Sequence, residues 1–224
     1  MKNKYAMFPI IMAGAALLCF LVLFFNMAAT VQPLWGKVMV LILPSLILST
    51  VAVFALKGRL DRRKTILATC ALSIILIIFS FVYTVFLSVL TATTVTTDIK
   101  FYTAAYEQID EEEGVAGIFP AKIPSDAESI SFRYHPQFLQ GGEWFELSYT
   151  TTANALSDWK AFLTSKAEWS GPNREWEQMN HIGFYGEDAM RYQLHWDGGF
   201  NHGEMAYVLI DPTQNRITYH YEDW

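Results

Sequence analysis

Three long apolar runs in the first half of the chain restrict its fold more than any other feature. Residues 8–29, 38–56 and 66–92 contain no Asp, Glu, Lys, Arg or His. At 1.5 Å per residue, a helix of about 20 residues crosses a hydrocarbon core about 30 Å thick. We therefore expect three transmembrane helices, at residues 8–29, 38–56 and 65–92. The third is long enough to tilt, and Pro44 is expected to kink the second.

Short basic segments predict how these helices are oriented. Residues 57–64 read KGRLDRRK and contain five cations and one acid, and residues 1–7 contain two lysines. The loop at residues 30–37 contains a single lysine. Short loops rich in Lys and Arg stay in the cytoplasm. We expect a multi-pass protein of the cell membrane, with residues 1–7 and 57–64 cytoplasmic, residues 30–37 in an outer loop, and everything after residue 92 extracytoplasmic.

The distribution of charge excludes some classes of function. Residues 1–97 contain eight Lys and Arg against one Asp, whereas residues 98–224 contain eight against 21 Asp and Glu. We expect the lipid bilayer as the partner of the basic half and no nucleic acid, because the basic loop between two spans offers little surface. The apolar runs contain no buried charge of the kind that marks ion pathways, which argues against a channel formed by this chain alone.

The remaining residues are long enough for one compact domain. We expect an exit segment, a short helix and a connector at residues 93–125, and an α+β domain at residues 126–224. The predicted helix covers residues 154–169, with Asn154 as its N-cap. Alternating apolar and polar residues predict strands at 129–135, 143–151, 189–196, 204–211 and 215–222. The expected fold class is thus three transmembrane α-helices followed by an extracytoplasmic α+β domain, an antiparallel sheet with a helix packed on one face.

Two stretches of this domain carry a resemblance. FPAKIPSDAESISFRYHPQFLQGGEWFELSY at residues 119–149 and LIDPTQNRITYHYEDW at residues 209–224 resemble outward domains of multi-pass membrane proteins of Gram-positive bacteria. The resemblance covers about half of the chain. It implies a bacterial cell membrane, but it assigns no functional residues. The domain also has no cysteine and no N-glycosylation sequon, which favours a bacterial origin over an animal one.

Motifs for catalysis or metal binding are incomplete. SDWK at residues 157–160 matches S-x-x-K without its companion motifs, and DEEE at residues 110–113 lacks the spacing of a calcium loop. Four residues carry atoms that can bind zinc: His181, His195, His202 and Glu204. They lack the spacing of a known zinc motif. We expect no catalytic residue, no metal and no cofactor, so a non-enzymatic role is favoured.

The polar side of the predicted strands is the candidate site. Alternation places on one face the candidate ligand-binding residues Arg133, His135, Glu146, Arg191, His195 and His220. One interpretation is an ordinary solvated face, and the other is a cationic cluster that binds an anionic or sugar ligand. Six of the seven tryptophans also lie in this domain, either as core residues or as a surface for a sugar or protein.

Three functions follow from these observations. The first is a membrane-anchored extracytoplasmic domain for binding, sensing or assembly, without enzymatic activity. The second is an extracytoplasmic hydrolase that uses the polar sheet face, and the third is an accessory subunit of a larger membrane complex. The partner expected besides the lipid bilayer is a cell-wall glycan or another membrane protein.

Overall fold

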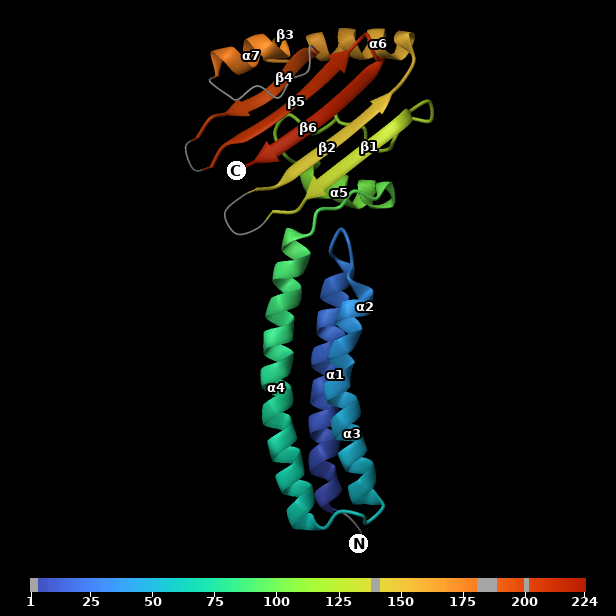
Figure 1. Cartoon of the computed structure of the whole chain (residues 1–224), viewed down its shortest axis with the longest axis vertical. Helices are drawn as coiled ribbons and strands as arrows, with labels where there is room; N and C mark the ends of the chain where they lie inside the picture. Colours follow the sequence, from blue (N-terminus) through green and yellow to red (C-terminus); the bar gives the residue numbers. More distant parts are fainter. Residues whose placement is uncertain (1–3, 138–141, 181–188, 200–201) are drawn as a thin grey trace. The chain divides into compact units, whose positions relative to one another are not determined.

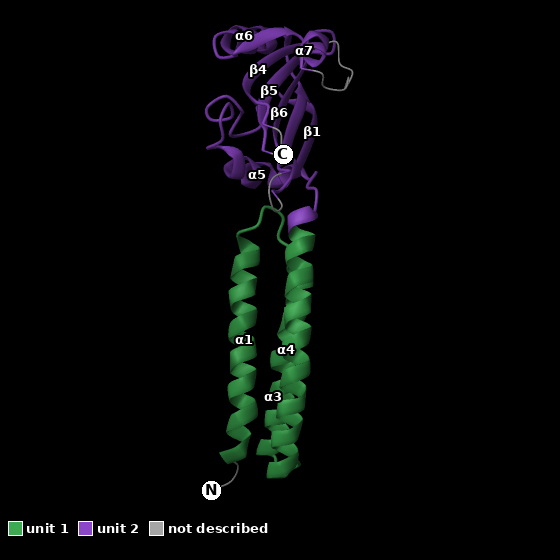
Figure 2. Ribbon diagram, turned by 90° about the vertical axis from the view of Figure 1, so that its left-hand side faces the viewer, with its two compact units in different colours: residues 1–91 green, residues 92–224 purple. Residues whose placement is uncertain are grey.

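The chain divides into two compact units, residues 1–91 and 92–224 (Figure 2). The computed structural model describes residues 4–137, 142–180, 189–199 and 202–224. Each unit is described by itself below.

The first unit consists of helices. Its elements are η1 (Lys4–Ala6), α1 (Met7–Ala28), α2 (Trp35–Val38), η2 (Met39–Ile42), α3 (Leu43–Leu56) and α4 (Arg62–Thr93). Three helical segments in the described part of the chain are long and apolar enough to cross a membrane, Lys4–Ala28, Trp35–Leu56 and Arg62–Thr93. The prediction of three long apolar helices is therefore confirmed, and each helix extends somewhat beyond its apolar run.

Pro44 explains why the second apolar run is not one continuous α-helix. Proline has no N–H group, so it cannot donate to the carbonyl four residues earlier. The structure changes to a 3-10 turn at Met39–Ile42 just before it, and the N–H of Leu43 donates to the carbonyl of Val40, three residues back. Pro44 then occupies the first turn of α3, where the missing donor is not needed.

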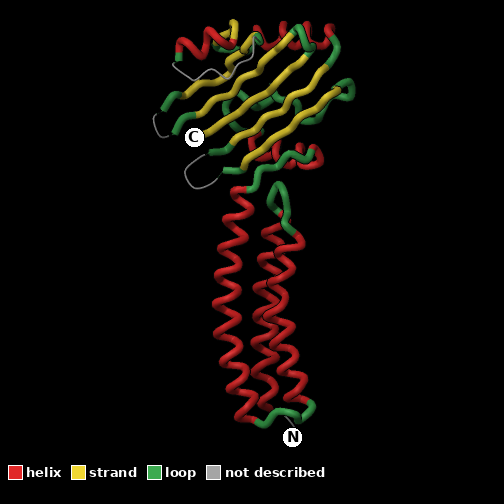
Figure 3. The backbone as a smooth tube through the Cα atoms, viewed as in Figure 1, coloured by secondary structure: helices red, strands yellow, loops and turns green. Residues whose placement is uncertain are grey.

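The second unit is a sheet with helices. Its helical elements are η3 (Ile99–Phe101), α5 (Tyr102–Ile109), α6 (Ala153–Thr164) and α7 (Asn173–Met179). Its strands are β1 (Glu128–His135), β2 (Trp144–Thr150), β3 (Trp169–Pro172), β4 (Met190–Asp197), β5 (Glu204–Asp211) and β6 (Arg216–Asp223). The six strands form one antiparallel sheet in the order β1-β2-β6-β5-β4-β3 (Figures 1 and 3).

Aromatic side chains fill the core between the sheet and the helices α5 and α6, which lie on the same side of it (Figure 2). Tyr102 of α5 contacts Phe132 and Phe145, with ring centroids 5.5 and 5.7 Å apart. Trp159 of α6 contacts Tyr219 of β6 at 5.7 Å. The alternation of β2 and β6 produces this core, because every second residue of a strand faces the same side.

The structure differs from the sequence prediction in four details. The helix expected at residues 154–169 ends at Thr164, and Thr152 rather than Asn154 is its N-cap, accepting a hydrogen bond from the N–H of Ala155. Residues 169–172 instead form strand β3, which pairs with β4. Helix α7 follows directly and was not predicted. Such a short strand and helix have little periodicity of their own and depend on tertiary packing.

Candidate binding face of the sheet

One face of the sheet is turned away from α5 and α6. Arg133, Glu146, His220 and Tyr207 are register partners across the adjacent strands β1, β2, β6 and β5. Partners in an antiparallel register point to the same side of a sheet, so these four side chains share a face. Figure 1 shows the sheet from this side, with α5 behind the strands. We call it the ladder face, because its side chains are stacked from strand to strand.

The stack combines two guanidinium groups with aromatic rings. The guanidinium of Arg133 lies 4.3 Å from the centroid of the Trp144 ring, and Trp144 meets the ring of His220 edge-on at 5.8 Å. His220 is stacked on Tyr207 at 4.6 Å, and the guanidinium of Arg191 lies 3.6 Å from the centroid of Tyr207. Cation–π and ring contacts of this kind are attractive, most of all where water is excluded. The row therefore orders the side chains of five adjacent strands.

Helix α7 closes one end of the stack. Its Trp176 lies 5.1 Å from the guanidinium of Arg191 and contacts the rings of Trp169 and Trp196 at 5.2 and 5.9 Å. Trp176 is buried, whereas Arg133 at the other end is exposed. The accessible part of the ladder face therefore lies over β1, β2 and β6.

Two carboxylates flank the buried imidazole of His220. Oε2 of Glu146 lies 3.7 Å from Nδ1, and Oε2 of Glu222 lies 3.3 Å from Nε2. The His220 side chain is only 8% exposed, but those of Glu146 and Glu222 are 31% and 37% exposed. Glu222 is within hydrogen-bonding distance of the imidazole, whereas Nδ1 has no hydrogen-bond partner among the described residues, and both carboxylates remain partly exposed to a ligand.

Arg191 is buried inside the protein. It is 3% exposed, Nε donates to Oε1 of Gln193 at 2.7 Å, and Nη1 donates to Oδ1 of Asn173 at 3.2 Å. Loss of hydration lowers the pKa of Arg191 to about 10, and the nearby Tyr207 and Glu177 oppose this shift only in part. This side chain packs against the Tyr207 ring and is not available to a ligand.

Five of the six predicted site residues lie on the ladder face: Arg133, His135, Glu146, Arg191 and His220. Nδ1 of His135 lies 2.9 Å from the carbonyl oxygen of Gly142. The expected cluster of accessible cations is not formed, because Arg191 and His220 are buried and two carboxylates adjoin His220. Arg133 is the exposed cation of this group. Whether any of the five binds a ligand stays a prediction.

The prediction for His195 is wrong about its position. Strand β4 has a bulge between Gln193 and His195, in which Leu194 is the extra residue. One extra residue reverses the alternation, so His195 pairs with Ala206 and faces the core side. There its Nδ1 lies 3.1 Å from Oε2 of Glu113.

Gly114 makes room for this arrangement. Its φ of +76° is in the left-handed region, and a Cβ atom there would lie 2.9 Å from the Cβ atoms of both His195 and Ala206. Only glycine allows the chain after α5 to approach the bulged strand so closely. The bulge and the turn at Gly114 therefore fit each other.

The sequence analysis missed the rings that connect the predicted residues. Neither Tyr207 nor Trp176 is among the residues predicted to form the site, and the only sequence signal at Trp144 is its break in the apolar alternation of its strand. A signal for α7 was present, since Pro172 directly precedes it and Glu175 lies in its first turn. The position of Trp176 over Arg191, however, depends on tertiary packing.

Acidic side chains gather at one end of the core face. Glu143 is 8% exposed, and its Oε1 accepts a hydrogen bond of 2.7 Å from the hydroxyl of Tyr134. Burial raises the pKa of Glu143, the nearby charges of Glu112 and Asp223 raise it further, and the hydrogen bond from Tyr134 opposes them. A carboxyl with a raised pKa binds protons more tightly in the folded state, so it costs stability as the pH rises through that pKa.

No metal site is formed by the described residues, where no three His, Cys, Asp or Glu side chains are placed to hold an ion. Of the four candidate zinc ligands, His181 lies outside the described residues.

Comparison with known proteins adds no identification. No family model matches the chain, and no curated protein and no solved structure matches it. The resemblance of residues 119–149 and 209–224 to outward domains of Gram-positive membrane proteins stays a prediction.

Proposed function

We propose that this protein is a membrane-anchored binding protein, whose three apolar helices span a cell membrane and whose second unit binds a glycan outside it. The basic segment at residues 57–64 supports a cytoplasmic position for the ends of the helices that it joins. The second unit then lies outside the cytoplasm.

Membrane insertion is supported by the apolar surface of the helices. In α4, Ile74, Ile75 and Ile77 are each 61% exposed, and Phe81 is 70% exposed. Soluble proteins rarely expose continuous apolar surface of this extent, whereas lipid tails solvate it at no cost.

The observation that carries the binding role is the accessible end of the ladder face. Trp144 and the exposed Arg133 are stacked there, beside the partly exposed carboxylates of Glu146 and Glu222. Sugar hydroxyls donate to carboxylates and accept from guanidinium groups, and aromatic rings contact the apolar faces of sugars. The mixture of one cation with two carboxylates favours an uncharged, hydroxyl-rich ligand over an anion.

The test is a glycan-binding screen on the full chain reconstituted in lipid nanodiscs, with soluble cell-wall fragments as probes. We expect Trp144→Ala and Arg133→Ala each to weaken binding by about tenfold or more, as contact residues at the centre of a binding surface do. Arg174→Ala, which removes an exposed arginine of α7 outside the stack, is the matched control and should change nothing.

Other results would contradict the proposal. If the parent protein binds no fragment, or both variants bind as well as the parent, the ladder face is only a solvated surface. Retention of a protein instead of a glycan by the same face would favour the accessory subunit. The hydrolase and the accessory subunit stay alternatives, and hydrolysis of the fragments during the screen would favour the first.

A further inference from the structure

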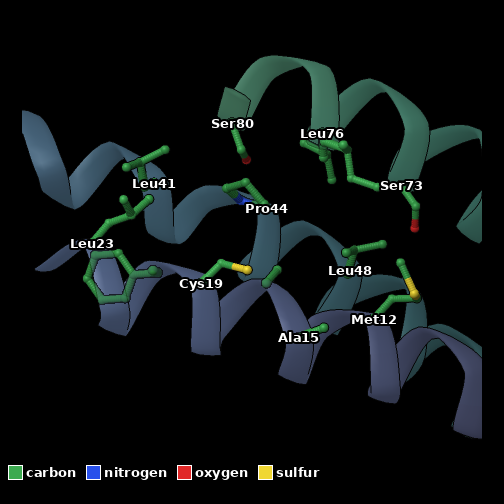
Figure 4. Close-up of a pocket in the computed structure, with 13 residues that line it drawn as sticks. Met12, Ala15, Cys19, Leu23, Leu41, Pro44, Leu48, Ser73, Leu76 and Ser80 are labelled. Atoms are coloured by element: carbon green, nitrogen blue, oxygen red, sulfur yellow. The ribbon is translucent and has the colours of Figure 1, made fainter. Parts of the chain in front are cut away.

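A cavity of about 300 Å³ lies within the helical unit, between α4 and the pair formed by α1 and α3 (Figure 4). Its lining comes from these three helices and from η2: Met12, Ala15, Ala16, Cys19, Phe20, Leu23, Leu41, Pro44, Leu48, Ser73, Leu76, Ile77 and Ser80. The cavity opens to the surface of this unit, because the lining residues Cys19 and Ile77 are also exposed, and its size is in the range that binds small molecules.

The cavity exists because α4 is attached to the other helices at two separate places. One cluster joins Leu87 of α4 to Phe20 and Leu41, and the other joins Leu76 to Ala13 and Leu48. By contrast, α1 and α3 contact each other directly, with the hydroxyl of Ser45 donating to the carbonyl of Ala13 at 3.0 Å. The lining residues run from one cluster to the other, so the cavity lies between them.

The shape of the cavity fits a hydrocarbon chain better than it fits another helix. Its lining on α1 extends from Met12 to Leu23, which is about 16 Å along a helix axis. A volume of about 300 Å³ over that length leaves a narrow passage, far thinner than a helix of about 10 Å diameter. A single extended hydrocarbon chain has the required width.

Ser73 indicates that the occupant also carries a polar atom. Ser73 is 6% exposed, and its Oγ has no hydrogen-bond partner among the described residues. Four other hydroxyls of α4, on Thr65, Thr69, Ser88 and Thr91, donate to the carbonyl four residues earlier. Figure 4 shows the oxygen atoms of Ser73 and Ser80 directed from α4 toward the space that faces α1 and α3.

This polar atom belongs to an uncharged group. None of the lining residues is Asp, Glu, Lys, Arg or His, so nothing in the cavity would balance a charge. A buried hydroxyl that lacks a partner is unfavourable, and an oxygen atom on the occupant would satisfy it.

From these observations we infer that the cavity binds an uncharged single-chain lipid, with one hydroxyl or carbonyl oxygen placed beside Ser73. The inference rests on the proposed membrane insertion, because a bilayer would supply such a molecule from the side.

Photolabelling of the full chain in lipid vesicles tests the inference. Two diazirine probes of equal length are used, a long-chain alcohol and the corresponding alkane, and labelled peptides are located by mass spectrometry. We expect the alcohol to label residues 12–23 and 73–80 about fivefold more than the alkane, a preference of the size that one hydrogen bond supplies.

Three variants assign this labelling to the cavity. Ser73→Ala should remove the preference for the alcohol and leave labelling by the alkane unchanged. Ala16→Phe fills the cavity and should abolish labelling by both probes. Ala71→Phe, at an exposed position of α4, is the matched control and should change neither.

Either of two results overturns the inference: equal labelling of Ala16→Phe and the parent, or a preference for the alcohol that survives in Ser73→Ala. Washing the same vesicles with alkaline carbonate shows whether the chain is inserted in the membrane. It thereby distinguishes a wrong lipid site from a wrong membrane anchor. A chain that is retained but shows no cavity labelling overturns the lipid site alone. A chain that the wash releases overturns the membrane anchor and the lipid site together.

Discussion

Replacement of Arg191 by alanine should destabilise the second unit by about 3 kcal/mol. The guanidinium donates two hydrogen bonds to oxygen atoms, each worth about 1.5–3 kcal/mol when the donor is charged, and a weaker one to the sulfur of Met205. Its contact with Tyr207 at 3.6 Å adds about 2 kcal/mol at a site without water. The variant no longer buries a charge, and burial of this charge destabilises the parent by several kcal/mol. The net loss is therefore well below the sum of the contacts.

A second substitution separates the volume of Arg191 from its hydrogen bonds. Arg191→Met keeps an apolar side chain against Tyr207 and Trp176 but leaves the oxygens of Gln193 and Asn173 without their donor. We expect it to cost about 1–2 kcal/mol, between the parent and Arg191→Ala. Arg174→Ala, at an exposed position of α7, should stay within about 0.5 kcal/mol of the parent.

The assay is urea unfolding of the detergent-solubilised chain, followed by tryptophan fluorescence. Six of the seven tryptophans lie in the second unit, so the signal reports on this unit. With a slope of about 1–3 kcal/mol per molar urea, a loss of 3 kcal/mol lowers the midpoint by about 1 M or more. If Arg191→Ala unfolds at the midpoint of the parent, the stack does not contribute to stability and the reasoning fails.

Three further predictions concern the pH dependence of stability, the orientation of the helices in the membrane and the folding of the second unit on its own. Because the pKa of Glu143 is raised in the folded state, the parent should lose stability relative to Glu143→Gln as the pH rises from the ordinary carboxyl value of 4.5 through that raised pKa. Urea midpoints of both proteins across this pH range measure the difference, and parallel curves would mean that Glu143 titrates normally. In a background without Cys19 and Cys70, an impermeant thiol reagent added to intact cells should label a cysteine at residue 215 but not at residue 3 or 64. Labelling at residue 64 without permeabilisation would reverse the proposed orientation. Residues 92–224 expressed alone should unfold cooperatively, because their core lies within this unit, and a reductant should not change the midpoint, because they contain no cysteine. A fragment without a cooperative transition would show that the sheet needs the helices or a partner.

The helices and most of the strands could be predicted from the sequence because their signals are local. The length of an apolar run is sufficient to identify a helix of membrane-spanning size, and the three runs appear as Lys4–Ala28, Trp35–Leu56 and Arg62–Thr93. Alternation in Phe145, Leu147 and Tyr149 likewise predicted which side of β2 is buried. Both patterns are local: the first is a run of apolar residues long enough for such a helix, and the second is an alternation in which every other residue faces a core.

The candidate site depends on contacts between segments that are far apart in the sequence, and the pattern of one segment does not show them. Alternation places Arg191 and His195 on the same face, but the extra residue Leu194 turns His195 to the other side. Gly114, about 80 residues earlier in the sequence, packs against this bulge. Only a glycine leaves enough space there. Helix α7 buries Arg191 by placing Trp176 over it, and seven residues are too few to form a stable helix without that packing. The sequence alone therefore determined the apolar helices and the faces of regular strands, whereas tertiary structure decided which polar side chains remain accessible, because burial and bulges depend on what packs against a strand.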